Sequence, residues 1–159
     1  MVFRWYHCKS SNLKEVNMAK TLKDLMEFFN KQPRIGVLGT ANKDGKPNIA
    51  HLGSPRMVDE KTVVAGLGQN RTLANLQENP YAVFIILEPG KSVPEWKGVR
   101  VYLKVVSIQS TGELLDGIRE SFIKKGNEGA AKMMKFAVSF EITELRPLAD
   151  RGQGWENMI

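Results

Sequence analysis

The sequence has few of the residues that build disulfide frameworks or metal sites. It holds a single cysteine, Cys8, and two histidines, His7 and His51, in 159 residues. One cysteine cannot form an internal disulfide, and these three residues do not match the spacing of any recognised zinc site. We therefore expect no metal site and interpret the chain as a cytoplasmic protein.

Long apolar runs and common catalytic motifs are also missing. No segment approaches the roughly 20 apolar residues that a membrane helix needs, and the first residues lack the features of a secretory signal. Neither a GxSxG elbow nor a P-loop ending in Gly-Lys-Ser/Thr is present. These absences disfavour a self-sufficient hydrolase and a membrane protein. Any chemistry is expected to depend on a bound cofactor.

The positive charge is scattered rather than gathered in blocks. The formal net charge is +6, with 42% hydrophobic and 25% charged residues, as in an ordinary globular domain. The clustered Lys and Arg with interleaved aromatic residues that a nucleic-acid site prefers are missing. We therefore expect a solvated basic surface that attracts small anions, and no nucleic-acid partner.

The chain divides into a short extension and one domain. Residues 1–17 show no clear periodicity, and Met18-Ala19-Lys20 resembles a second start. We predict an N-terminal extension over residues 1–17 and a single domain over residues 18–159.

Periodicity in the domain predicts several strands and a few helices. Apolar residues at helical spacing after Thr21 predict a first helix that ends before Pro33. Further helices are expected after Asn70 and over residues 113–125. Strands are predicted over residues 34–42, 47–58, 61–68, 81–88, 98–108 and 136–145.

The links between the strands indicate an antiparallel arrangement. Asn42-Lys43-Asp44-Gly45 lies between the first two predicted strands and is a hairpin signal, because glycine accepts the positive φ of a tight turn. The continuously apolar run over residues 81–88 favours a central strand buried on both faces. About six strands joined first by hairpins predict a small, mostly antiparallel barrel with helices packed around it.

A candidate anion site follows the third predicted strand. Asn70, Arg71 and Thr72 stand at the mouth of a predicted helix, where unpaired N–H groups and the helix dipole favour anions. Arginine adds a planar fork of donors, and threonine adds a hydroxyl. The alternative is that Asn70 only caps the helix and that Arg71 and Thr72 are exposed first-turn residues. Taken alone, the stretch favours this plainer interpretation.

The order of these elements resembles the pyridoxamine-phosphate-oxidase-like split-barrel family of FMN-binding proteins, over roughly residues 21–148. The matching motifs are Thr40-Ala41 at the end of the first strand, the Asp44-Gly45-Lys46-Pro47 turn, a second strand from His51 to Met57, Arg71-Thr72 before Leu76, and Asn79-Pro80 before the apolar strand. The resemblance implies a mostly β fold with flanking helices, a six-stranded antiparallel split β-barrel. It also implies a homodimer with FMN in the clefts between the subunits.

The resemblance assigns residues of this chain to the cofactor phosphate. Arg71 and Thr72 would hold the phosphate, and Asn75, one helical turn further on, would face the same cleft. Gly66 and Leu67 would contact the cofactor through the backbone at the end of the third strand.

The resemblance also lays the flavin ring along the second strand. The ring would contact His51, Leu52, Gly53 and Ser54, with Arg56 as a basic group near it. Gly53 would allow close approach because it has no side chain, although it is equally well explained as a bulge or a simple strand glycine. Without the resemblance, His51 would be interpreted as a half-buried strand residue and Ser54 as an outward polar position.

The chain departs from the oxidases at its end. The closing stretch, residues 146–159, holds Arg151 and Trp155 but no histidine, so it does not match the segment that contacts pyridoxal phosphate in the oxidases. We therefore predict an FMN-binding oxidoreductase that acts on another small molecule or an electron carrier, with no catalytic residue assigned. The alternatives are deazaflavin F420 or haem in the same fold, or a non-catalytic flavin-binding electron carrier. Met133 and Met134 fall near the region where relatives place a partner residue by the flavin, but we interpret them as packing beneath the last strand.

Overall fold

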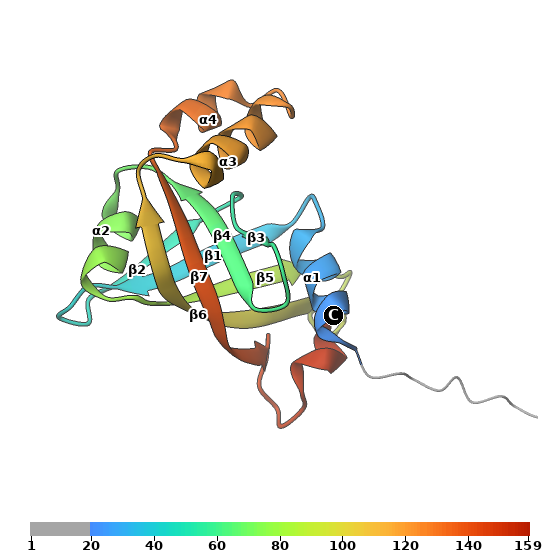
Figure 1. Cartoon of the computed structure of the whole chain (residues 1–159). Helices are drawn as coiled ribbons and strands as arrows, with labels where there is room; N and C mark the ends of the chain where they lie inside the picture. The colour runs from blue at the N-terminus through green and yellow to red at the C-terminus, as the bar shows by residue number, and fades with distance from the viewer. Residues whose placement is uncertain (1–19) are drawn as a thin grey trace, which may run out of the picture.

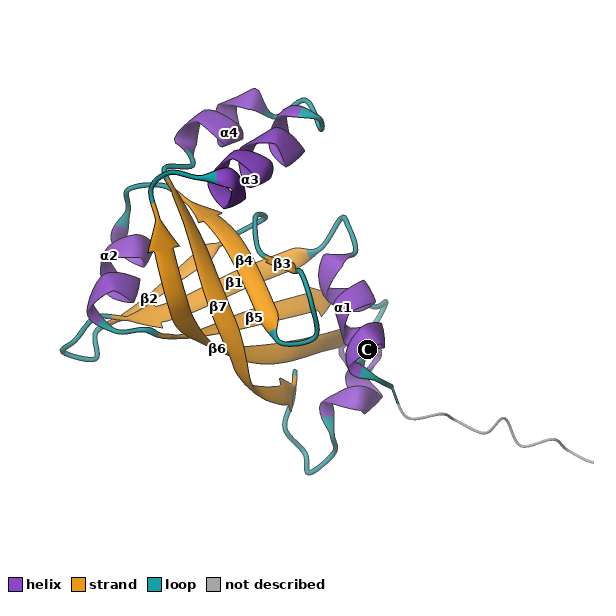
Figure 2. Cartoon of the chain, in the orientation of Figure 1, coloured by secondary structure: helices purple, strands orange, loops and turns teal. Residues whose placement is uncertain are grey.

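The computed structural model describes residues 20–159, which form an antiparallel sheet with helices around it (Figures 1 and 2). The predicted extension, residues 1–17, lies outside the described residues. The strands are β1 (Ile35–Ala41), β2 (Pro47–His51), β3 (Arg56–Met57), β4 (Thr62–Leu67), β5 (Tyr81–Glu88), β6 (Lys97–Gln109) and β7 (Phe136–Pro147). The helices are α1 (Leu22–Asn30), α2 (Arg71–Glu78), α3 (Glu113–Ile123) and α4 (Glu128–Met133), with 3-10 turns η1 (Val93–Glu95) and η2 (Trp155–Met158).

The two edge strands of the sheet, β2 and β3, follow one another in the sequence. The strand order is β2-β1-β5-β6-β7-β4-β3, and every neighbouring pair is antiparallel. The link from His51 to Arg56 reaches at most roughly 18 Å when fully extended. The edge strands β2 and β3 must therefore come close at this end, which rolls the sheet into the predicted split barrel. We call the opening between them the seam.

The long strands β6 and β7 are bent where their register shifts. Irregularities lie between Tyr102 and Leu103 and between Val105 and Ser107. Such bulges bend a strand and increase its twist. Beyond Lys104, β6 continues to pair with β7 but no longer with β5, and the Val105 N–H donates to the carbonyl of Pro80 at 2.8 Å.

The predicted second strand is wrong in one respect, because it is broken in two. After the Leu52 N–H donates to Gly36 O at 3.0 Å, the chain leaves β1, and pairing resumes only at β3 on the other side of the seam. Pro55 cannot donate to a ladder, which fits its place in this break. The sheet therefore has seven strands instead of six.

The expectation that β5 is buried on both faces is also wrong. The strand is central, between β1 and β6, but only one face reaches the core, where Ala82, Phe84 and Ile86 are buried. On the other face Tyr81 is 58% exposed and Val83 is half-buried. An apolar run does not reveal whether a strand has neighbours on both sides, and no helix within residues 20–159 covers this face of β5.

The helices follow local signals in the sequence, with one exception. Thr21 and Asp24 form a capping box at the start of the predicted helix α1, and Leu25 and Phe29 anchor the helix in the barrel core. Helix α4 was not predicted because it is only one and a half turns long. It begins after Asn127, whose side-chain oxygen accepts from the Ala130 N–H at 3.1 Å. No helix within residues 20–159 is both long and apolar enough to span a membrane.

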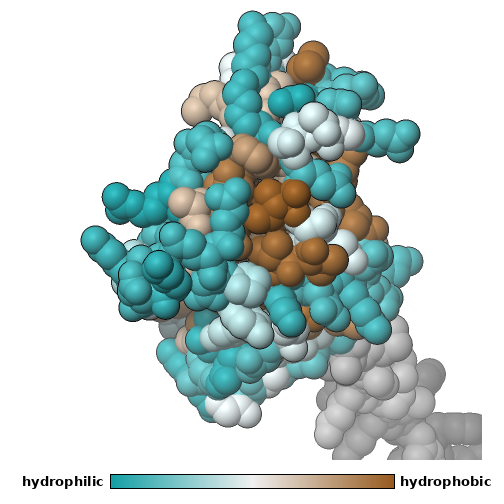
Figure 3. Space-filling model, turned by 60° about the vertical axis from the view of Figure 1, so that its left-hand side comes forward, coloured by the Kyte–Doolittle hydropathy of each residue, from teal (hydrophilic) through white to brown (hydrophobic). Residues whose placement is uncertain are grey.

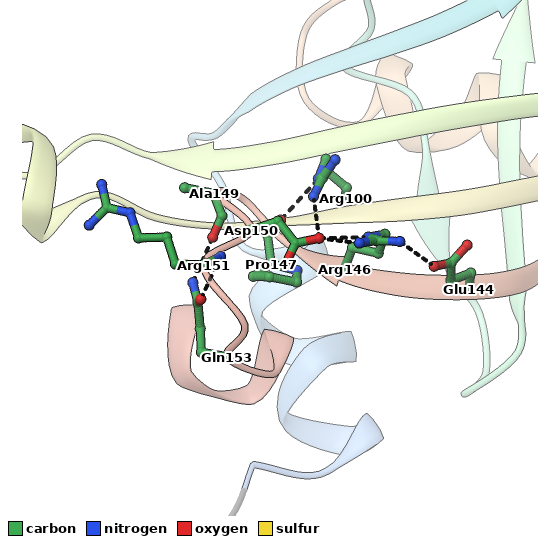
Figure 4. A network of polar contacts seen from close by, with 8 residues as sticks. All are labelled: Arg100, Glu144, Arg146, Pro147, Ala149, Asp150, Arg151 and Gln153. Atoms are coloured by element: carbon green, nitrogen blue, oxygen red, sulfur yellow. Dashed lines mark hydrogen bonds and ion pairs between the residues drawn. The ribbon is translucent and has the colours of Figure 1, made fainter.

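The segment after β7 is tied back to the barrel by charged side chains (Figure 4). Arg100 Nε donates to Pro147 O at 2.9 Å, and its Nη2 lies 3.6 Å from Asp150. Arg146 donates hydrogen bonds to the same carboxylate. The hydrogen bonds from Arg146 lower the pKa of Asp150 below its ordinary value of 3.8. Downstream, Trp155 packs against the barrel core.

The lowered pKa makes a testable contribution to stability. A carboxyl group whose pKa is depressed by folding stabilises the folded state above its unfolded pKa of about 3.9, and this stabilisation is lost as the pH falls through the folded pKa. Asp150→Asn should therefore slightly lower Tm at pH 7, and the difference from the parent should shrink as the pH falls toward 3. Thermal unfolding at a series of pH values measures this, with the exposed Glu60→Gln as control. A difference that does not change with pH would contradict the ion-pair assignment.

Candidate cofactor site

Two clefts meet where β4 leads into α2. The first, which we call the seam cleft, has a volume of about 310 Å³. It is lined by the link and strand-end residues His51, Leu52, Gly53, Ser54, Gly66, Leu67, Gly68 and Asn70, and by Phe122, Ala130, Met133 and Met134 of the α3–α4 region. The second, the hairpin cleft, has about 220 Å³ and is lined by Asn42, Lys46, Pro47, Arg71 and Asn75. Because Asn70 lines one cleft and Arg71 the other, the start of α2 separates them.

The hairpin cleft combines two cations with a helix N-terminus. Arg71 is exposed at the first position of α2, and Lys46 comes from the β1–β2 hairpin. The Asn70 side chain caps the helix by accepting from the Leu73 N–H at 3.1 Å. This cap leaves the N–H groups of Arg71 and Thr72 directed out of the helix end. The cap of the plainer interpretation is therefore present, and two cations, Lys46 and Arg71, stand at the same helix end.

Thr72 does not present its hydroxyl to either cleft. Its side chain is buried, at 3% exposure, and its Oγ1 accepts a hydrogen bond from Asn48 Nδ2 at 3.2 Å. Asn75 is also buried, and its Nδ2 donates to Thr40 Oγ1 at 3.1 Å. These pairs fix α2 on β1 and β2. Thr72 can reach a bound anion only through its N–H.

Lys46 is a site residue that sequence reasoning missed. It lies in the Asp44-Gly45-Lys46-Pro47 turn, a motif of the family resemblance to which no contact with a ligand was assigned. The pairing of Ala41 with Pro47 folds the hairpin back, and the Asn48–Thr72 hydrogen bond places its second strand beside α2. The signal was therefore in the turn, but only the register of β1 and β2 brings Lys46 to Arg71.

In the seam cleft the backbone around Gly53 is accessible. Gly53 lies in the break between β2 and β3, and open space surrounds the position that a Cβ would take. It is therefore not a strand glycine. His51 is exposed at the end of β2. These residues offer a surface that a flat group can approach closely.

Other polar groups predicted to meet a ligand are already paired. The Ser54 hydroxyl, buried at 6% exposure, donates to Gly66 O at 2.8 Å, and Leu67 O accepts from the Lys135 N–H at 2.8 Å. A Cβ on Gly66 would lie 2.6 Å from Met134 Sδ. Gly66 thus makes room for the packing of Met134. The carbonyls of Gly66 and Leu67 thus each already accept one hydrogen bond from within the chain, whereas the backbone at Gly53 is open.

Arg56 is separated from most of the other predicted residues. With Ser54 it lines a third cleft, against α3. It lies near Arg34, whose guanidinium stands 5.0 Å above the Phe29 ring and donates to Pro55 O. Burial, and secondarily the charge of Arg56, lower the pKa of Arg34 to about 10. Arg56 therefore adds positive potential behind the seam without lining the seam cleft.

The methionines and Trp155 fall in different places. Met134 packs with Leu115 and Ala137 beneath β7, as predicted, whereas Met133 is 73% exposed at the rim of the seam cleft. Trp155 lies in η2, at the opposite end of the barrel from α3 and α4 (Figure 1). It is therefore remote from both clefts.

The two clefts are lined mostly by cationic, amide and apolar groups, with His51 as their imidazole. Among residues 20–159, no group of three or more His, Cys, Asp or Glu side chains could hold a metal ion. None of the residues that line the seam and hairpin clefts is an aspartate or glutamate. The arrangement can hold an anion between Lys46 and Arg71 and a flat, mostly apolar group in the seam cleft.

Comparison with known proteins identifies the family. The family described as pyridoxamine 5'-phosphate oxidase matches residues 22–149, most of the chain. The chain therefore belongs to this family, as the motifs in its sequence predicted. No match was found among curated proteins.

Solved structures share the fold at low sequence identity. An FMN-binding protein from Syntrophomonas wolfei is 24% identical with a TM-score of 0.70, and the match covers 81% of this chain and 86% of that one. HutZ, a haem storage protein from Vibrio cholerae, is 18% identical with a TM-score of 0.60, over 86% and 99% of the two chains. An F420 reductase is 17% identical with a TM-score of 0.55, over 75% and 93%. At these identities the likeness establishes the fold alone.

The burial of Thr72 gives a testable distinction between a structural and a ligand-binding hydroxyl. Thr72→Val keeps the shape but leaves the Asn48 amide without its acceptor, so the free energy of unfolding should fall by about 1–2 kcal/mol. Urea unfolding measures the loss. Thr111→Val, at an exposed position, is the matched control and should have little effect. Equal stability of Thr72→Val and the parent would show that the Asn48 contact contributes nothing.

Proposed function

We propose that the chain is an FMN-binding flavoprotein, an oxidoreductase that acts on a small molecule or an electron carrier. The observation that carries this proposal is the junction of the two clefts at the start of α2. A cationic pocket for a phosphate lies directly beside an apolar cleft with accessible backbone for a flat ring. The family membership and the likeness to an FMN-binding protein support the same reading.

The phosphate end is the better defined part of the proposed site. Lys46 and Arg71 would neutralise the phosphate charge, and the N–H groups of Arg71 and Thr72 would add hydrogen bonds at the positive end of the helix. Asn75 and Thr72 would support the phosphate site mainly indirectly, because their side chains fasten α2 to the sheet. The proposed phosphate set is thus Lys46, Arg71 and the first turn of α2.

The ring would lie in the seam cleft, along the link from His51 to Ser54. Its polar edge would meet backbone groups of the link, because Gly66 O and Leu67 O are already hydrogen-bonded. Apolar side chains of the α3–α4 region would face the opposite side. FMN, when bound, would supply hydride or electron transfer, while this chain would bind and orient the cofactor.

Haem is the second candidate, and one residue favours it. Haem iron needs an axial donor such as an imidazole, and His51 stands exposed at the edge of the seam cleft. The haem storage protein among the similar structures shows that this fold accommodates such a function. Deazaflavin F420 would occupy the site much as FMN does, with the same demand for a phosphate pocket.

We propose that a second copy of the chain completes the cofactor site. The outer face of β1, β2 and β5 carries an apolar groove of about 460 Å³, with Ile49 74% exposed and Tyr81 58% exposed beside it. Figure 3 views the side of the molecule that carries α2 and the β1–β2 hairpin, and shows apolar side chains framed by hydrophilic ones. Contiguous apolar surface of this kind marks an interaction site. We propose a homodimer, in the cytoplasm as the single cysteine suggests.

The visible spectrum of the purified protein tests the cofactor. Flavin absorption is expected, a Soret band would indicate haem instead, and a band to the blue of FMN would indicate a deazaflavin. A colourless protein that takes up no added FMN would overturn the proposal.

Titration of the flavin-free protein with FMN tests the phosphate pocket. Arg71→Ala and Lys46→Ala should each weaken binding by ~1.5–3 kcal/mol, roughly tenfold or more, because each removes a charge-assisted hydrogen bond. Lys43→Ala is the matched control, because this lysine is on the same hairpin but does not line the cleft. If neither cleft variant weakens binding more than the control, the phosphate is held elsewhere.

The mass of the protein in solution tests the dimer. Ile49→Glu should produce monomers, because it buries a charge in the proposed interface. Val58→Glu, exposed in the turn after β3, should leave the mass unchanged. A parent protein that is monomeric at micromolar concentration would contradict the proposed dimer.

A further inference from the structure

The α3–α4 region is a unit with its own small core. Leu115, Met134 and Ala137 are buried together, with Leu114, Ile118, Phe122 and Ala130 packed around them, and this cluster is separate from the core of the barrel. The two helices stand at one end of the barrel, above the ends of β4 and β7 (Figure 1). The same unit lines one side of the seam cleft through Phe122, Ala130, Met133 and Met134.

The unit packs against the barrel at two glycines: Gly66 in β4 and Gly68 just after it. Met134 and Ile118 occupy the space beside Gly66, where a Cβ would lie 2.6 Å from Met134 Sδ and 2.9 Å from Ile118 Cγ2. A Cβ on Gly68 would lie 3.1 Å from the carbonyl oxygen of Met133. Both helices therefore touch β4: the carboxyl end of α4 at Gly66 and Gly68, and α3 at Gly66 through Ile118.

Arg119 is the polar group that fastens α3 to the carboxyl end of α4. Its Nε and Nη2 donate to the carbonyl oxygen of Met134 at 3.1 and 2.8 Å, and its Nη1 lies 3.5 Å from Asp116 on the same helix. The backbone is permissive at both ends of α3, since Gly112 and Gly126 have φ values of 109° and 74°. Without Arg119, apolar packing alone would hold α3 between two glycine joints.

We propose that Arg119 is a positioning residue that holds the α3–α4 unit closed as a movable wall of the seam cleft. The part of the inference that concerns FMN rests on the proposed function; the part that concerns the wall does not. The wall presents Phe122 and Met133, an aromatic ring and a polarizable thioether, and no charged side chain. It is therefore suited to the face of a flat aromatic group rather than to an anion.

The first experiment uses the flavin-free protein, so that it does not depend on the cofactor. Arg119→Met keeps the apolar stem but removes every donor, and Lys124→Met changes an exposed residue at the end of the same helix, with 78% of its side chain exposed. Hydrogen exchange should become faster in α3 and α4 of Arg119→Met, with no change in β1 and β5. The control should resemble the parent. Unchanged exchange in α3 and α4 would overturn the proposal.

The second experiment uses the flavin-loaded protein. In Arg119→Met the Kd for FMN should rise about fivefold or more, and iodide should quench the fluorescence of the bound flavin more strongly, because the wall opens. If hydrogen exchange becomes faster but neither the Kd for FMN nor the iodide quenching changes, the unit is not a wall of the cofactor site. This result would overturn the part of the inference that concerns FMN. Arg119→Lys, which retains a single donor, should lie between the parent and Arg119→Met in both experiments.

The two proposals fail in different ways. If the parent protein binds no FMN, the proposed function fails, while hydrogen exchange still decides whether Arg119 holds the wall. If the parent binds FMN but Arg119→Met behaves as Lys124→Met does, the role of Arg119 fails and the proposed function stands. Should Arg119→Met not fold, Arg119→Lys decides by the same measurements.

Discussion

The interruption of strand pairing between β2 and β3 is the constraint from which the site follows. A continuous second strand would have paired with β1 along its whole length and would not have reached β4. Because pairing with β1 stops at His51 and pairing with β4 begins at Arg56, the two edges of the sheet are joined, unpaired, by a short link. The link lines the seam cleft, and its backbone is accessible at Gly53, which belongs to no ladder.

Two buried polar pairs then fix the cationic pocket relative to this link. Asn48 with Thr72, and Asn75 with Thr40, join α2 to β2 and β1 where apolar contacts alone would allow the helix to slide. Buried hydrogen bonds are directional, and an unpaired partner is costly. The distance between the N-terminal end of α2 and the link is therefore set by these side-chain pairs. Thr72 and Asn75, both buried, fix the position of the helix, and Asn75 also lines the hairpin cleft.

Much of the architecture could be predicted from the sequence because its signals are local. The capping box at Thr21, the positive φ at Gly45 and the alternation in β7 are each properties of a few neighbouring residues. The family, and with it the split barrel, followed from the order of such signals. The break at Pro55, the half-covered face of β5 and the presence of Lys46 beside Arg71 were not predicted. Each depends on which segments lie next to one another in space, and a single sequence does not record this.

The glycines at positions 66 and 68 separate two parts of the molecule that are built differently. The barrel core is complete without the α3–α4 unit, which carries its own apolar cluster and meets the barrel at these small residues. Residues of the helices that do not contact β4 or β7 can therefore vary with little effect on the core of the barrel. A fold divided in this way allows evolution to exchange one wall of the seam cleft while the scaffold, and the cationic hairpin cleft fixed to it, are inherited unchanged.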